Sequence, residues 1–139
     1  MPNIREHRWL DMCLLFAWGR KMSKTYRSIK QDIAIAKRLA DSVIRNDVLR
    51  EDTGARCVDV LHERALKAAL LMAIFELPET ALFQELRYNL MFRWFLDLGI
   101  DEALSPPRLC VAWRHLQARG HAKNFFERFA SRAHHVFKR

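Results

Sequence analysis

Glycine, proline and cysteine are all scarce in this sequence. Only four glycines and four prolines occur among 139 residues, so the chain lacks the frequent turns that an all-β sandwich or barrel requires. The three cysteines lie far apart and form no Cys-x-x-Cys pair. Their number and spacing argue against a disulfide framework and are typical of a reducing compartment, so we expect a cytoplasmic location.

Long hydrophobic runs are also missing. The most apolar run near the start, Met12–Trp18, is too short to span a bilayer and lacks the small-x-small cleavage site of a signal peptide. We therefore expect no membrane association. The surrounding segment, residues 4–20, predicts a helix that is apolar over much of its circumference, and such a helix is either buried or pressed against a partner. This predicts a homodimer or another protein partner, with contacts from Trp9, Met12 and Phe16.

Positive charge is in excess, and it is unevenly distributed. The formal net charge is +8. Residues 20–38 carry seven Lys/Arg against one acid and residues 103–139 carry eight against one, whereas residues 39–102 carry seven against twelve. Two basic blocks around an acidic centre indicate a polyanion partner, most often nucleic acid. The alternative is a basic solvated surface without a specific partner.

Apolar residues recur with helical spacing along most of the chain, and no strand pattern is visible. Half of the residues are hydrophobic, which is enough for a substantial core. We predict an all-α protein, a single compact domain of about six helices over residues 1–139, with an extra helix in residues 1–23. The expected buried stripes are Ile29, Ile33, Ala36, Ala40 and Val43; Leu66, Leu70, Ala73 and Ile74; and Phe125, Phe126, Phe129 and Ala133.

Proline, serine and glycine mark the expected helix ends. Pro78 is expected to separate a long helix from a short one, and Ser105 and Pro106 to begin a later helix. Gly99 and Gly120 are expected to end the helices that precede them.

The segment LRYNLMFRWFLDLGIDE, residues 86–102, combines aromatic side chains with arginines. Leucine and tryptophan recur here at a spacing of four, which predicts one buried stripe that consists of Leu86, Leu90, Trp94 and Leu98. Phe95 flanks this stripe. Arg87 and Arg93 lie off this stripe. The sequence leaves two roles open for them, either contacts to phosphates or helix pairs such as Arg93 with Asp97.

This segment resembles the N-terminal domain of bacterial insertion-sequence transposases of the DDE type. The family's run Q-L-x-Y-N-L-x-F-R-W-F-x-x-L-x-x-D is matched in order by Leu86, Tyr88, Asn89, Leu90, Phe92, Arg93, Trp94, Phe95, Leu98 and Asp101. The preceding residues ALKAALLMAIFELPETALFQEL are similar to the family's helix, turn and second helix. The resemblance covers residues 24–130, and residues 1–23 have no counterpart. It implies a helical domain of transposase descent.

Two further departures from that family bear on function. Its transposases continue into an RNase H-like domain with the catalytic carboxylates, and this sequence stops before that region, so we expect no strand cleavage. The segment ALSPPRLCVAWRHLQ also departs from the family's D-x-S-T-F-S-x-x-R pattern, with only Arg114 and Leu116 matching. No DNA site preference is therefore inferred from the resemblance.

Cysteine and histidine spacing predicts no metal site. Cys57 with His62, and Cys110 with His115, are each five residues apart, whereas zinc sites pair ligands two to four apart. No Gly-rich phosphate loop, paired-carboxylate constellation or Cys-His signature is present. We expect no metal, no cofactor and no enzymatic activity.

The basic residues are the candidate nucleic-acid contacts, because Lys and Arg bind phosphate oxygens without reading sequence. A helix-turn-helix is predicted at residues 65–86 or at residues 106–132, where the second helix carries more positive charge. The predicted nucleic-acid-binding residues are Arg20, Lys21, Lys24, Arg27, Lys30, Arg108, Arg114, Arg119, Lys123 and Arg128.

These observations predict a non-catalytic DNA-binding protein derived from a truncated transposase, which acts as a regulator or as a competitor of a related transposase. The alternative is a protein-binding inhibitor or adaptor that blocks a nucleic-acid-handling complex, such as a bacterial defence nuclease, through residues 4–20. A third interpretation, a folded remnant without a selected role, stays open at this point.

Overall fold

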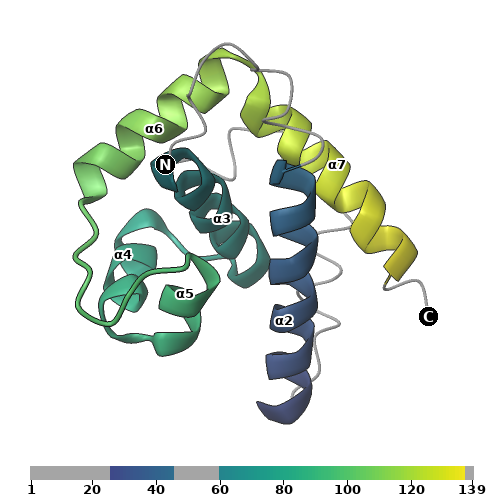
Figure 1. The fold of residues 1–139 in the computed structure, drawn as a ribbon, viewed down its shortest axis with the longest axis horizontal. Coiled ribbons are helices and arrows are strands. Elements are labelled where there is room, and N and C mark those ends of the chain that lie inside the picture. Colours follow the sequence, from purple (N-terminus) through teal and green to yellow (C-terminus); the bar gives the residue numbers. More distant parts are fainter. Residues whose placement is uncertain (1–25, 46–59, 137–139) are drawn as a thin grey trace.

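The computed structural model describes residues 26–45 and 60–136, and within these ranges the chain forms helices without any strand (Figure 1). The helices are α2 (Tyr26–Val43), α3 (Val60–Phe75), α4 (Glu79–Tyr88), α5 (Leu90–Phe95), α6 (Pro106–Ala118) and α7 (His121–Val136). The all-α prediction is confirmed. The predicted helix at residues 4–20, with Trp9, Met12 and Phe16, lies outside the described residues. None of the helices in the described ranges is both long and apolar enough to cross a bilayer.

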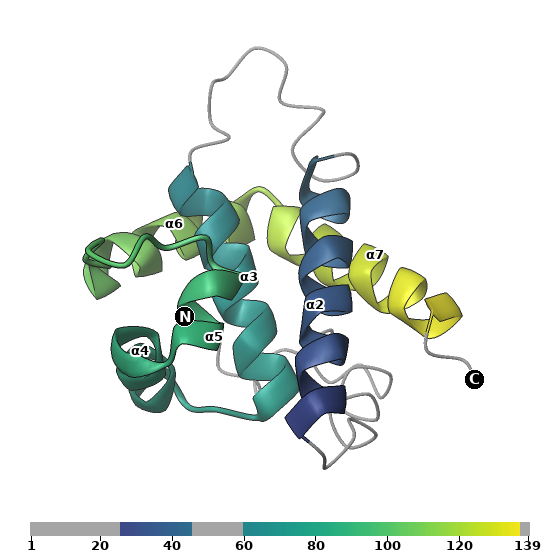
Figure 2. The same cartoon turned by 60° about the horizontal axis from the view of Figure 1, so that its bottom comes forward.

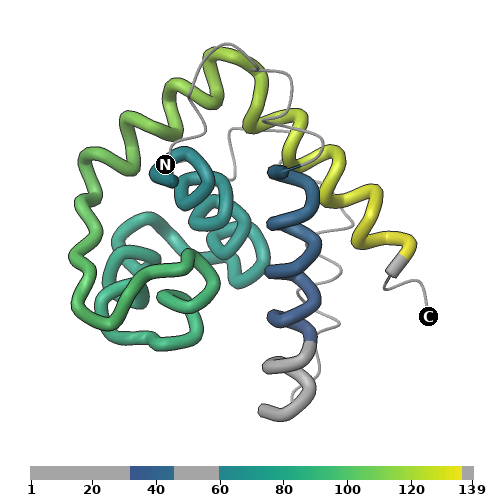
Figure 3. Tube along the Cα trace, viewed as in Figure 1, coloured from purple at the N-terminus to yellow at the C-terminus, as the bar shows by residue number. Residues whose placement is uncertain are grey.

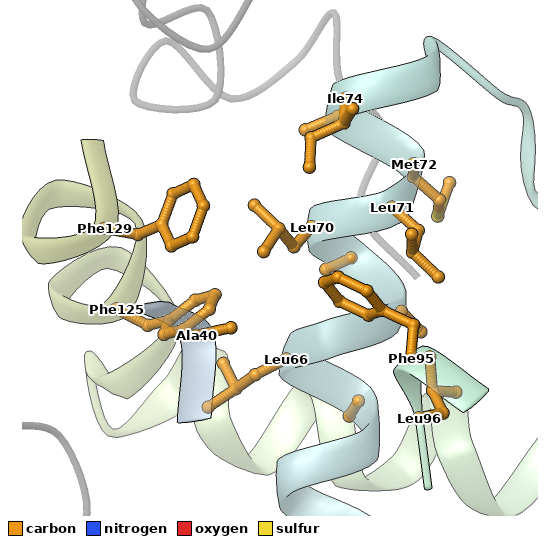
Figure 4. Packing of buried hydrophobic residues seen from close by; sticks show 14 of the residues in the cluster. Ala40, Leu66, Leu70, Leu71, Met72, Ile74, Phe95, Leu96, Phe125 and Phe129 are labelled. Atoms are coloured by element: carbon orange, nitrogen blue, oxygen red, sulfur yellow. The ribbon is translucent and has the colours of Figure 1, made fainter. Parts of the chain in front are cut away.

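Helix α3 is the centre of the molecule. Ten consecutive residues, Ala65–Ile74, are buried, because their sequence is apolar around nearly the whole helix circumference. Figure 4 shows Leu66 and Leu70 directed toward Phe125 and Phe129 of α7, while Phe95 lies on the other side of α3. The other helices therefore wrap around α3.

Helices α6 and α7 form an arch over the remaining helices (Figure 3). Helix α6 packs on α3, and α7 packs on α2; the view in Figure 2 shows α2 in front of α7 and α3 beside α2. The joint of the arch is Arg119 followed by Gly120, whose φ of 77° is a left-handed conformation that glycine adopts without steric cost. The prediction that Gly120 ends this helix is confirmed, and so are Ser105 and Pro106 as its beginning.

The predicted stripes form most of the core. All members of the three stripes are buried, apart from Ile29, whose side chain lies outside the described residues. Phe125 and Phe126 pack edge to face with ring centroids 5.4 Å apart, which is a favoured aromatic geometry.

The aromatic segment is not one continuous helix. Asn89 interrupts it, because its side-chain oxygen accepts hydrogen bonds from the backbone N–H groups of Met91 (2.9 Å) and Phe92 (3.4 Å) and so caps a new helix, α5. The interruption changes the helical phase. Leu90 and Trp94 are 73% and 48% exposed, so their predicted core position was wrong. The core positions predicted for Leu86, Phe95 and Leu98 are confirmed, and the core also takes Phe92 and Leu96.

The end of α5 also differs from the prediction. Asp97, not Gly99, adopts the left-handed conformation, with φ of 56°. The N–H of Leu98 donates to the carbonyl of Arg93 (2.9 Å), which completes a Schellman-type helix end. Aspartate tolerates this conformation better than most residues. The Asp97 side chain also forms ion pairs with Lys37 and Lys67, which are described below.

Candidate nucleic-acid interface

Four charged side chains join α2, α3 and the end of α5, and we call them the charged clamp: Lys37, Asp41, Lys67 and Asp97. Lys67 is only 1% exposed, and its ammonium contacts Asp41 and, at 3.0 Å, Asp97. Lys37 pairs with the same two carboxylates, at 3.3 Å and 2.7 Å. Each carboxylate thus bridges both lysines, and the net charge of the clamp is zero. Such mutual compensation is what allows a lysine to be buried.

The charged clamp changes the pKa of two of its members. Partial burial by itself raises the pKa of Asp97, but hydrogen bonds and positive charges from Lys37 and Lys67 outweigh it and hold the pKa below the ordinary 3.8. Burial likewise lowers the pKa of Lys37, but the hydrogen bond to Asp97 and the negative charges of Asp41 and Asp97 outweigh it and raise the pKa above 10.5.

These shifts predict a stability loss in acid that depends on Asp97. A carboxyl group whose pKa is lower in the folded state contributes stability above its unfolded-state pKa, and that contribution disappears as the pH falls through the lower folded-state value. The difference in unfolding free energy between the wild type and Asp97→Asn should therefore be constant at neutral pH and shrink as the pH falls below about 3.8. Urea unfolding over a pH series measures it. A difference that stays constant down to the lowest pH would show that the ion pairs of Asp97 with Lys37 and Lys67 do not contribute to the free energy of unfolding.

Arginine 93 binds backbone oxygens and not a helix neighbour. Its guanidinium donates to the carbonyl of Leu86 at 2.9 Å, to those of Gly99 and Glu102 at 2.6 Å each, and more weakly to Ile100 at 3.4 Å. The end of α4 is thereby tied to the segment that follows α5. Of the two roles that the sequence left open for Arg93, the pair with Asp97 does not form, because Asp97 belongs to the charged clamp.

Arg64 supports the same segment from α3. It donates to the carbonyls of Leu96 (3.2 Å) and Asp97 (3.0 Å) and pairs with the carboxylate of Glu102 at 2.5 Å. The arginines at positions 64 and 93 and the charged clamp together fix the turn after α5 on the core. Three carboxylates of the acidic centre, Asp41, Asp97 and Glu102, are thus paired with cations inside the fold.

The cations of α6 and α7 have a different environment. All five predicted there are exposed, and we call them the basic face: Arg108, Arg114, Arg119, Lys123 and Arg128. Lys123 approaches Glu127 at 3.9 Å, one helical turn away. Within the described ranges Arg108, Arg114 and Arg128 form no ion pair. The basic face therefore presents positive charge to solvent, as phosphate contacts require.

The nucleic-acid contacts predicted in the other basic block lie outside what the structure describes. The side chains of Arg20, Lys21, Lys24, Arg27 and Lys30 are not among the described residues. Their role as nucleic-acid contacts therefore stays a prediction. The helix pairs α3–α4 and α6–α7 lie where a helix-turn-helix was predicted, and that identification also stays a prediction.

Cysteine and histidine side chains form contacts in the described ranges, but not in groups large enough to hold a metal ion. The rings of His62 and His115 stack with centroids 6.2 Å apart. The sulfur of Cys110 lies 3.4 Å from the carboxylate of Glu79. No group of three or more His, Cys, Asp or Glu residues that could hold a metal ion occurs in this part of the chain.

The architecture is that of a small helical domain whose internal charges hold the fold and whose outer helices carry exposed cations. The family described as Transposase domain (DUF772) matches residues 38–116, which is more than half of the chain. The chain belongs to this transposase domain family. No curated protein and no solved structure matches it. The family match covers the aromatic segment, most of α6 and three members of the charged clamp, Asp41, Lys67 and Asp97, and it ends before α7.

Sequence reasoning missed the charged clamp. Two of its ion pairs join residues 30 and 60 positions apart in the sequence, and no periodicity connects such residues. One signal was present: Lys67 is the only charged residue in the apolar run from Ala65 to Phe75. A lone lysine in a run that is apolar on all sides requires a carboxylate partner once the helix is buried.

Proposed function

We propose that this transposase-derived protein binds duplex DNA through the basic face and acts without cutting it, as a regulator or as a competitor for the DNA ends of a related transposase. The proposal places it in the cytoplasm and includes descent from DDE-type insertion-sequence transposases, which the aromatic motif supports. The observation that carries it is the set of exposed cations on α6, on α7 and at the joint between them.

The distribution of acids supports this proposal. Asp41 and Asp97 neutralise Lys37 and Lys67, and Glu102 pairs with Arg64. These carboxylates are therefore engaged away from α6 and α7, where Arg108, Arg114 and Arg128 form no ion pair with another described residue. Exposed arginines on consecutive helices suit phosphate contacts, which set affinity and its salt dependence and do not select a sequence.

Arg114→Gln is expected to weaken binding to a duplex of random sequence by several-fold and to reduce the salt slope of the binding constant by about one. One phosphate contact is lost, while the fold keeps its core because Arg114 is exposed. Fluorescence anisotropy of a labelled duplex at two salt concentrations measures both quantities.

The matched control is Arg45→Gln, which removes one exposed arginine at the end of α2, outside both basic blocks. It should leave the affinity and the salt slope almost unchanged. Equal effects of the two substitutions would indicate only a general attraction to net charge. If the wild-type protein binds no duplex at low salt, the DNA proposal is wrong, and the protein-binding alternative through residues 4–20 takes its place.

A further inference from the structure

Helix α4 borders a cleft of about 720 Å³. One wall is the outer face of α4, and the other is the segment of residues 103–106 that leads into α6. The lining residues are Thr80, Phe83, Gln84, Leu86, Arg87, Tyr88, Arg93, Ala103, Leu104 and Pro106. Its volume is in the range of small-ligand pockets, so it has room for one or two nucleotides but not for a duplex.

The polar groups of this α4 cleft are aligned. Thr80, Gln84, Arg87 and Tyr88 follow one another at spacings of four, three and one, which places them on one face of α4. Within the described ranges, none of these four side chains has a hydrogen-bond or ion-pair partner. The lining also includes the apolar side chains of Phe83, Leu86 and Leu104. The cleft thus combines an apolar lining with several polar groups that are available to a ligand.

Arg93 holds the two walls of the cleft together. Its guanidinium donates to the Leu86 carbonyl on α4 and to the Glu102 carbonyl, which directly precedes the second wall. The separation of the walls is therefore set before a ligand arrives. Preformed sites bind with a smaller loss of conformational entropy.

The chemistry of the α4 cleft fits a nucleotide strand. The guanidinium of Arg87 can bind a phosphate in a two-pronged manner. The ring of Tyr88, a residue 78% exposed, offers a face on which a base can stack. The amide of Gln84 carries both a donor and an acceptor for a base edge.

We propose that the α4 cleft binds an unpaired nucleotide strand next to a duplex that lies on the basic face. This rests on the proposed function and extends it to DNA ends and junctions. The two sites are connected in the chain, because Pro106 lines the cleft and begins α6, and Arg108 of the basic face follows two residues later. A strand that leaves the duplex can reach the cleft along the start of α6.

The test compares a blunt duplex with the same duplex carrying a short single-stranded oligothymidylate tail, both labelled and titrated against the full chain. The tailed duplex should bind about tenfold more tightly, since stacking one base on an aromatic ring contributes on this order. Tyr88→Ala and Arg87→Gln should abolish most of this advantage and leave the affinity for the blunt duplex unchanged. Both residues are exposed, and thermal unfolding checks that each variant is folded.

Arg114→Gln is the matched control, because it should weaken the binding of both duplexes equally and preserve their ratio. Equal affinities of the wild type for the two duplexes would overturn the cleft proposal, while salt-dependent binding of the blunt duplex would keep the proposed function. A tail preference that survives in both cleft variants would also overturn it. Binding of free oligothymidylate without binding of the blunt duplex would support the cleft and overturn the duplex site. An acidic extended peptide is then added as a competitor for the tail. If it displaces the tail, binds more tightly than the tail and depends on Tyr88, the cleft is a peptide site and the nucleotide proposal is wrong.

Discussion

Replacing Lys67 with alanine is expected to lower the free energy of unfolding by about 3 kcal/mol, because it removes the buried cation from a partly buried ion-pair network. Lys67 is 1% exposed and contacts both aspartates of the charged clamp. Without it, Lys37 alone must compensate two carboxylates that are held near each other. The exposure of Asp97 on one side keeps the expected loss at the lower end of the range for buried pairs.

Urea unfolding of Lys67→Ala and Lys67→Met separates charge from packing. Methionine replaces most of the volume of the lysine stem but supplies no positive charge, so it should recover less than half of the loss. Lys123→Ala is the matched control on the surface, since Lys123 and Glu127 are exposed and 3.9 Å apart; its expected cost is below about 0.5 kcal/mol. If Lys67→Met is as stable as the wild type, the charges of the clamp do not contribute to stability and only the stem of Lys67 does.

Periodicity predicted the parts of the fold in which each helix buries one face. Ile33, Ala36, Ala40 and Val43 of α2 are such a face, and all four are buried. The same reasoning failed at Leu90 and Trp94, because it assumed one uninterrupted helix. A single side chain, that of Asn89, caps α5 and breaks the phase. Asparagine is a known capping residue, but within a run of apolar residues spaced by four its effect on the helix is not visible from spacing alone.

Some features of the candidate site could likewise be predicted from the sequence, and others could not. Exposure of Arg108, Arg114 and Arg128 could be predicted, since arginines that lie off an apolar stripe remain in solvent. The role of Arg93 could not, because its partners are carbonyl oxygens that become free only where helices end. Where those ends meet in space depends on the tertiary structure. The α4 cleft was missed for the same reason, since residues 103–106 come to face α4 only in the folded chain.

Replacing Arg93 with lysine is expected to lower the free energy of unfolding by about 2 kcal/mol, although the charge is kept, because hydrogen bonds from charged donors contribute on this order. The planar guanidinium reaches the Leu86 carbonyl with one nitrogen and the Gly99 and Glu102 carbonyls with the other. A single ammonium group cannot span both sides, so carbonyl oxygens at the end of α4 or after α5 lose their donor.

Arg93→Lys should lower the stability of the whole fold and, in addition, loosen the segment after α5. Urea unfolding measures the stability of Arg93→Lys, and amide hydrogen exchange should become faster in residues 98–104, while the core of α3 is less affected. Arg87→Lys is the matched control on the neighbouring helix, because Arg87 is exposed and has no ion pair in the described part of the chain; it should change stability by less than about 0.5 kcal/mol. Unchanged stability and unchanged exchange in Arg93→Lys would mean that charge alone holds the segment after α5 against α4, and that the fork-like geometry of the arginine has no role in fixing the walls of the cleft.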